Sequence, residues 1–181
     1  MMTLGEAWEW YTEVRESLER MKRLGTRYWG TIPWEQAPWR SDNQFAELEA
    51  RSVIKSADIG LRHLDDQAIV VLFSVFEAIV RGKILEEIRK ERHDSRHRVI
   101  IAAIQAAMER VSEGSFFNVL EAYKGPDNNL IEQVNQVRRF RNWVAHGRRN
   151  DEPSSVTPPQ AYERLTRFVQ TFFPSEPVSE S

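Results

Sequence analysis

The chain has 181 residues, of which 41% are hydrophobic and 29% charged, and its formal net charge is −2. This composition is typical of a soluble globular domain with a core of its own, and it excludes a largely disordered chain. The absence of cysteine excludes disulfides, thiolate metal sites and cysteine nucleophiles. The N-terminal residues do not resemble a signal peptide, so we expect a cytoplasmic protein. Because no apolar run approaches the roughly 20 residues that span a bilayer, we expect no membrane segment.

The N-terminal part of the chain predicts one helix followed by an irregular segment. Apolar residues recur at helical spacing from Ala7 to Leu24, after a Thr3/Glu6 capping box, and Gly25 is expected to end this helix. The next segment, Tyr28 to Trp39, is rich in aromatic residues and interrupted by prolines, so it cannot be a regular helix. Its aromatic side chains either stack on unpaired bases or hold a loop against the helices.

Two further helices are predicted before residue 94. A capping pattern at Ser41 begins the first, which runs toward His63, and Asp65–Asp66 begins the second. The second is apolar on almost every side from Ala68 to Val80, which predicts the central helix of the core. Its polar positions recur at helical spacing and form one stripe, which faces either water or a functional cleft. These positions are Gln67, Ser74, Glu77 and Arg81.

A charged junction, residues 89–98, separates this helix from the next. Asp94 or Ser95 is expected to cap the helix that follows. His93 and His97 are four residues apart, a spacing that can hold a metal ion on one helix. Because arginines surround the pair and few carboxylates are near, we predict no metal site here.

The rest of the chain predicts four more elements. These are a helix from Val99 to Val111 ended by Gly114, a short element at Ser115–Leu120, a long helix capped by Asp127 or Asn128, and a final helix from Thr157 to Pro174. Residues 174–181 are predicted to be a disordered tail. Residues 1–173 are therefore predicted to form a single all-α domain. Its expected architecture is an antiparallel, up-down bundle of four main helices plus one or two additional helices.

The long helix ends in the most unusual stretch of the chain, residues 137–149. It contains Arg138, Arg139, Arg141, Arg148 and Arg149 together with Asn142 and His146, and no acidic residue. A local basic cluster in a chain of negative net charge suits the binding of a few phosphates better than the coating of a nucleic acid. The alternative is that basic residues are placed here only because they favour a helix C-terminus.

Helical geometry constrains how these residues can act together. At about 100° per residue, Asn142 and His146 lie on one face, whereas Arg141 and His146 are about 140° apart. Arg141 also falls within the apolar stripe of the helix, so its guanidinium must be paired or must line a polar cleft. Arg141 and His146 converge only if Gly147 lets the last turn unwind, or if two copies meet across a two-fold axis.

The segment Arg141-Asn142-Trp143-Val144-Ala145-His146 has the form Arg-Asn-x-x-x-His and resembles the motif of the HEPN superfamily. These small helical domains often act as metal-independent ribonucleases. The resemblance implies RNA cleavage by 2′-hydroxyl attack, which leaves 2′,3′-cyclic phosphate and 5′-hydroxyl ends and needs no cofactor or metal. It also implies a homodimer with the motif at the interface. A histidine can both accept and donate the proton near neutral pH.

Each candidate residue then has an expected role. His146 would move the proton, Arg141 would bind the phosphate and Asn142 would orient the histidine or hold a phosphate oxygen. Glu77 is the polar core residue expected to support the motif. The four remaining arginines, Arg138, Arg139, Arg148 and Arg149, are expected to bind RNA.

Other interpretations stay open. HEPN toxins often carry a tyrosine two residues after the motif histidine, where they are modified, and here Arg148 stands in its place. A toxin or phage-defence effector with an antitoxin or regulatory partner is therefore one setting among several. A non-catalytic HEPN-like module that binds nucleotide or RNA, or only dimerises, is the main alternative. The third is a structural adaptor, in which Arg141 pairs with Glu77 and His146 caps the helix.

Overall fold

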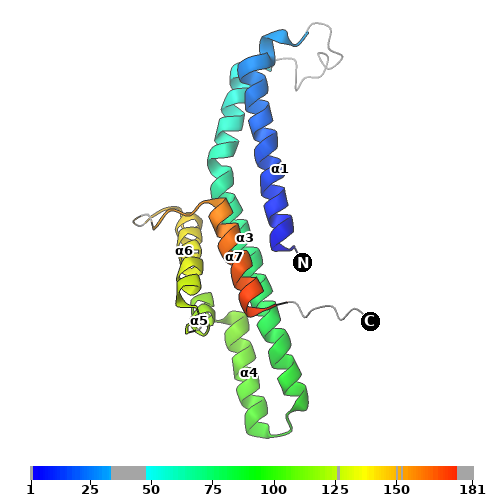
Figure 1. Ribbon diagram of the computed structural model, residues 1–181, viewed down its shortest axis with the longest axis vertical. Coiled ribbons are helices and arrows are strands. Elements are labelled where there is room, and N and C mark those ends of the chain that lie inside the picture. Colours follow the sequence, from blue (N-terminus) through cyan, green and yellow to red (C-terminus); the bar gives the residue numbers. More distant parts are fainter. Residues whose placement is uncertain (1, 34–47, 126, 150, 152, 175–181) are drawn as a thin grey trace. The chain divides into compact units, whose positions relative to one another are not determined.

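The computed structural model describes residues 2–33, 48–125, 127–149, 151 and 153–174. Within these ranges the chain is all-α and contains no strand, which confirms the predicted class (Figure 1). The helices are α1 (Leu4–Arg23), α3 (Ala50–Asp94), α4 (Arg98–Glu113), α5 (Phe116–Glu121), α6 (Asn128–Ala145) and α7 (Pro158–Phe172). A π-helical turn, η1 (Leu24–Tyr28), and a 3-10 turn, η2 (Trp29–Thr31), follow α1. No helix among the described residues is both long and apolar enough to cross a bilayer.

The chain divides into two compact units, Met1–Ala7 with Ile69–Ser181 and Trp8–Ala68. In the second unit, α1 packs against the first part of α3 through the buried side chains of Tyr11, Leu64 and Ala68. Gly25 is also buried, and a Cβ atom there would lie 2.7 Å from Ile54 Cγ1. This glycine therefore serves close helix packing within η1, whereas we predicted that it simply ends the first helix.

The predicted break at Asp65–Asp66 is wrong, because α3 is one continuous helix of 45 residues. Carboxylates are favoured at helix N-termini, so the acidic pair resembled a helix start. In the structure the Asp65 carboxylate instead accepts hydrogen bonds from Tyr11 Oη at 2.9 Å and Arg15 Nη1 at 2.7 Å. Both donors lie on α1, far away in the sequence. The predicted start at Ser41 and the end of the aromatic segment at Trp39 lie outside the described residues.

The core of the first unit forms around α3, as the apolar run predicted. Ile69, Leu72, Phe73, Phe76 and Val80 are all at most 1% exposed. The Phe76 ring packs edge-on against Phe116 of α5 at 5.7 Å and against Phe168 of α7 at 5.2 Å. The helix α6 contributes a buried apolar stripe: Leu130, Ile131, Val134 and Val137. This packing fixes one face of α6 toward the core and leaves the opposite face to solvent.

Four predicted helix ends are confirmed by their hydrogen bonds. The Glu6 amide donates to Thr3 Oγ1 at 3.1 Å, and the Leu130 amide donates to Asp127 Oδ1 at 2.9 Å. A capping box at Thr157 starts α7, and the Gly114 amide donates to Arg110 O at the end of α4. These caps depend on residues within four positions of one another, which explains why the sequence predicts them.

The predicted cap of α4 is wrong. The N-cap is His97, which makes no side-chain capping bond, rather than Asp94 or Ser95. His93 belongs to the last turn of α3. The two histidines therefore do not share one helix, and the spacing argument for a metal pair does not apply to them. At the other end of the chain, α7 stops at Phe172, and residues 175–181 of the predicted tail lie outside the described residues.

Candidate active site

The C-terminal end of α6 is closed by a turn that redirects the chain. The Gly147 amide donates to Val144 O at 3.0 Å and the Arg148 amide donates to Trp143 O at 2.9 Å, which is the bonding pattern of a Schellman motif. Gly147 has φ 73° and Arg148 has φ 58°. Glycine adopts this left-handed conformation without steric cost, whereas arginine rarely does. The turn therefore ends the helix at the motif histidine and determines where Arg149 lies.

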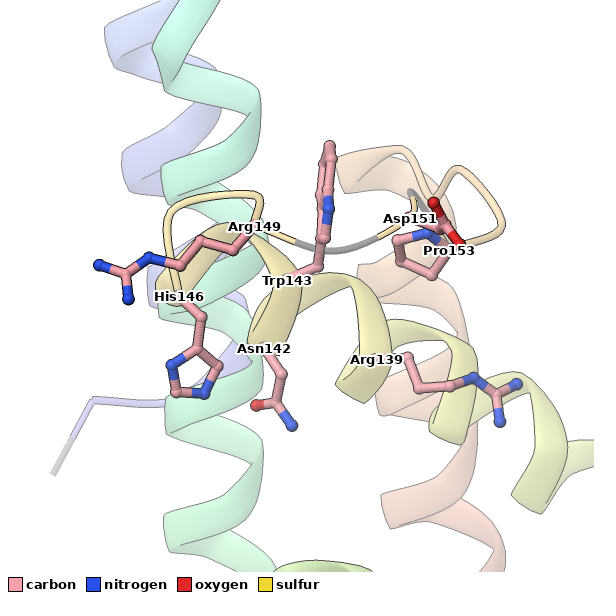
Figure 2. A pocket seen from close by; sticks show the side chains of 7 residues that line it. All are labelled: Arg139, Asn142, Trp143, His146, Arg149, Asp151 and Pro153. Atoms are coloured by element: carbon pink, nitrogen blue, oxygen red, sulfur yellow. The ribbon is translucent and has the colours of Figure 1, made fainter.

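An open pocket of about 490 Å³ lies beside this turn (Figure 2). It is lined by Arg139, Asn142, Trp143 and His146 from α6 and by Arg149, Asp151 and Pro153 from the following segment. The four helical residues stand at positions i, i+3, i+4 and i+7, so they share one face of the helix. Figure 2 shows the side chains of Asn142 and His146 leaving the same side of α6. The structure therefore brings these two motif residues together, as their spacing predicts.

The pocket also contains residues that the sequence analysis did not assign to a site. Trp143 is half-buried on the same face, and Asp151 adds a carboxylate from the loop. The helical spacing of Trp143 relative to Arg139 and His146 was the available signal. No pattern in the sequence indicates that Asp151 lines the pocket. Its position depends on the turn formed by Gly147 and Arg148, which both have positive φ.

Arg141 lies on the opposite side of α6 and does not line the pocket. Its guanidinium carbon is 5.9 Å from the centre of the Phe73 ring on α3, within the apolar stripe. Nη1 donates to Asn142 Oδ1 at 3.1 Å, while Nε is buried without a hydrogen-bond partner among the described residues. The helix continues to Ala145 without unwinding. Among the residues that the structure describes, the guanidinium of Arg141 is therefore linked to the pocket through its hydrogen bond to Asn142.

Glu77 is engaged away from the pocket. Its Oε1 accepts hydrogen bonds from Arg81 Nε at 3.0 Å and from Arg81 Nη2 at 2.7 Å. The same guanidinium donates to the carbonyl oxygens of Val111 and of Gly114 at the end of α4. Glu77 thus pairs with Arg81, not with Arg141 as the adaptor interpretation requires. Its supporting role in the site stays a prediction.

The remaining four arginines have different environments. Arg138 Nε donates to Asn135 Oδ1 at 3.1 Å, and its guanidinium carbon lies 4.9 Å from the centre of the Phe117 ring. Burial, with the charge of Arg139 close by, lowers the pKa of Arg138. This residue is part of the packing between α5 and α6 more than of the solvent-facing surface.

Arg139, Arg148 and Arg149 face solvent around the end of α6. Arg139 forms an ion pair with Glu132, two turns earlier in the helix. The guanidinium carbon of Arg148 lies 4.8 Å from the centre of the Trp143 ring. Glu132 therefore supplies one counter-charge that the stretch 137–149 lacks. Only Arg139 and Arg149 of the predicted RNA-binding arginines line the pocket.

Within the described ranges, no group of three or more histidine, aspartate and glutamate side chains is arranged to hold a metal ion. No family model matches the chain, and comparisons with curated proteins and with solved structures give no significant match. The HEPN resemblance rests on the Arg-Asn-x-x-x-His motif and its position at the end of a helix.

Proposed function

We propose that the chain is a metal-independent endoribonuclease of the HEPN type that uses His146 for proton transfer. The observation that supports this proposal is the shared pocket of Asn142, His146, Arg139 and Arg149. The pocket combines an exposed imidazole with an amide and two guanidiniums. The imidazole can transfer a proton, and the other groups can donate hydrogen bonds to the phosphate oxygens of an RNA phosphodiester.

The proposed reaction needs only groups of the chain and of the RNA. His146 accepts the proton of a ribose 2′-hydroxyl while that oxygen forms a bond to phosphorus. The bond from phosphorus to the 5′-oxygen breaks, and the leaving oxygen takes up a proton, which the same imidazole can return. The products are a 2′,3′-cyclic phosphate and a 5′-hydroxyl. DNA is not cleaved, because it has no 2′-hydroxyl.

Phosphate binding is proposed for Arg149 and Arg139, because they are the pocket's own guanidiniums. Arginine suits this role through its fixed fork of donors. Asp151 in the same pocket offsets part of their charge, which favours a locally held phosphate over general attraction to polyanions. Arg141 acts as a positioning residue, since its Nη1 holds the Asn142 amide oxygen.

The proposal includes a homodimer with the motif at the interface, acting in the cytoplasm. The pocket is open on one side, so a second copy could cover it and add a second His146 and Arg149 to the bound RNA. An antitoxin or regulatory protein, in a toxin or phage-defence setting, would act by covering the same opening. The helices of the first unit would then correspond to the up-down four-helix bundle of HEPN domains.

One observation favours a second candidate, a non-catalytic HEPN-like module that binds nucleotide or RNA. The arginine of the motif packs over Phe73 and lies on the face of α6 opposite the pocket. If Arg141 must touch the phosphate directly, a single chain lacks that contact. Binding through Arg139 and Arg149 does not depend on it.

The proposal is tested by incubating the full chain with tRNA and structured RNA in EDTA and analysing the product ends. The variants are His146→Ala, Asn142→Ala and Arg149→Ala, with His63→Ala as the matched control because His63 is exposed and belongs to the second unit. We expect cyclic-phosphate ends from the wild type and from His63→Ala, and none from His146→Ala. Intact RNA in every lane, with binding that Arg149→Ala weakens, would support the binding module. Equal cleavage by all variants would contradict the role of His146.

A further inference from the structure

The helix α4 is apolar on most of its surface, yet none of its residues is buried. Ten of its sixteen residues, in the sequence RVIIAAIQAAMERVSE, are Val, Ile, Ala or Met. Val99 is 70% exposed and Ile100 is 51% exposed. A helix with this composition is normally covered by other elements, because exposed apolar surface is costly. Ile101, Ile104, Met108 and Val111 are half-buried, while no described element of the same unit covers the side that carries Val99 and Ile100.

The exposed side chains form a groove rather than scattered points. Val99, Ile100, Ala103, Ile104 and Ala107 line it on α4, and Ile88 and Glu91 line it on α3, around a volume of about 400 Å³. The two helices run antiparallel, joined by residues 95–97 (Figure 1). The small side chains of Ala103 and Ala107 at the centre would let another helix approach closely. This shape suits a helix as the occupant.

The charges around the groove are arranged so that it is complementary to itself. Glu91 lies at the end nearest the α3–α4 turn, and Arg110 lies toward the other end, beside Ile84 and Val111. Arg110 follows Ala103 by seven residues and Ala107 by three, so it lies on the same face of α4 as the groove. An antiparallel copy of α4 would place Glu91 beside Arg110 of the second copy.

We propose that a second copy of the chain covers this groove, with the two α4 helices antiparallel and Ala103 of each copy facing Ala107 of the other across a two-fold axis. In this register Glu91 faces Arg110 of the second copy. The contact occurs twice, as an isologous interface requires. The surface shares no residue with the pocket at the end of α6, so this proposal does not rest on the nuclease proposal. A chain that also pairs through its motif would form a tetramer or a larger assembly.

The first test measures the mass of the full chain by sedimentation velocity over a concentration series. The variant Val99→Asp with Ile100→Asp places charge in the groove at two exposed positions, so folding should be retained, as circular dichroism would verify. We expect its mass to be half that of the wild type, with association weakened at least about tenfold. Ile59→Asp is the matched control, because Ile59 is 45% exposed and belongs to the other compact unit. The proposal is overturned if the wild type is monomeric at its highest soluble concentration, or if both variants change the mass equally.

The second test concerns the antiparallel register. Glu91→Arg and Arg110→Glu should each weaken association, because each brings like charges together twice in the dimer. The double variant exchanges the two charges and should recover most of the wild-type association. Failure of the double variant to recover it would overturn the proposed register.

Discussion

Arg141 Nη1 donates a hydrogen bond to Asn142 Oδ1 at 3.1 Å, which links the core-facing side of α6 to its pocket-facing side. Because the amide oxygen of Asn142 is already taken, its NH₂ group is the part left to face a ligand. An amide donor suits a phosphate oxygen or the acceptor nitrogen of an imidazole. The Arg141 side chain thus orients the Asn142 amide, whose NH₂ group is directed toward the pocket.

This hydrogen bond predicts that substitutions of Arg141 affect RNA cleavage or binding more uniformly than they affect the free energy of unfolding. Arg141→Met keeps the bulk over Phe73 but removes a charge whose Nε has no described partner, so stability should change by no more than about 1 kcal/mol. Arg141→Ala also loses the packing and should cost about 1–2 kcal/mol. Both variants should lower RNA cleavage or binding, because both release Asn142. Urea denaturation and the RNA assay together check this. Loss of stability without any effect on RNA would instead show that Arg141 has a purely structural role.

The contacts of Arg81 predict a structural role for the Glu77–Arg81 pair. Arg81→Met would leave the carbonyl groups of Val111 and Gly114 without their charged donor, and should lower the free energy of unfolding by about 2 kcal/mol. Glu77→Gln keeps an acceptor for Arg81 and should cost about 1 kcal/mol or less. Thermal and urea unfolding measure both changes. Cleavage per folded molecule should be unchanged in Glu77→Gln, and a clear decrease there would instead show that Glu77 supports the site.

Backbone conformation predicts opposite effects of alanine at two glycines, Gly147 in the turn after α6 and Gly82 within α3. Gly147 has φ 73° and open space around it, so Gly147→Ala should cost about 1–2 kcal/mol through backbone strain alone. Gly82 lies within α3 with open space at its Cβ position, so Gly82→Ala should stabilise the protein by about 0.5–1 kcal/mol. Gly147→Asn should cost less than Gly147→Ala, because asparagine tolerates this conformation. Equal effects of alanine at both positions in urea denaturation would contradict this account.

Local patterns in the sequence predicted four of the helix ends and the shared face of Asn142 and His146. Thr3 with Glu6, Asp127 with Leu130, and the motif residues all act within a few positions of each other. The position of Arg141 in the apolar stripe followed from the same helical geometry. Such features depend on the regular spacing of residues along a helix, so they can be predicted from residues a few positions apart in the sequence.

Contacts between distant residues account for what the sequence did not predict. The acidic residue Asp65 resembles a helix start until Tyr11 and Arg15 of α1 are known to hold its carboxylate. Likewise, the sequence did not indicate that the guanidinium carbon of Arg138 lies 4.9 Å from the centre of the Phe117 ring on α5. In both cases the partner lies on another helix, and no local pattern indicates which helices will meet.

Tyr123 predicts a pH dependence of stability in the alkaline range. Burial, with the charge of Glu87 as a smaller cause, raises the pKa of this phenol from its ordinary value of 10.0 to about 12. In the unfolded chain the phenol loses its proton near the ordinary value, while the folded protein still retains it. The unfolded state then binds fewer protons, so the free energy of unfolding must fall as the pH rises from about 10 toward 12. Below that range the contribution of Tyr123 is fully present.

Tyr123→Phe removes this titration, so its stability should fall less steeply than that of the wild type between about pH 10 and the folded pKa. Part of the slope should remain, because burial and the hydrogen bond with Asp65 also raise the pKa of Tyr11. Urea unfolding at a series of alkaline pH values measures both slopes, and the difference between the two proteins near pH 8 provides the baseline. Identical slopes would mean that Tyr123 ionises equally well in the folded and unfolded chains, which its packing against Phe168 and Phe172 argues against.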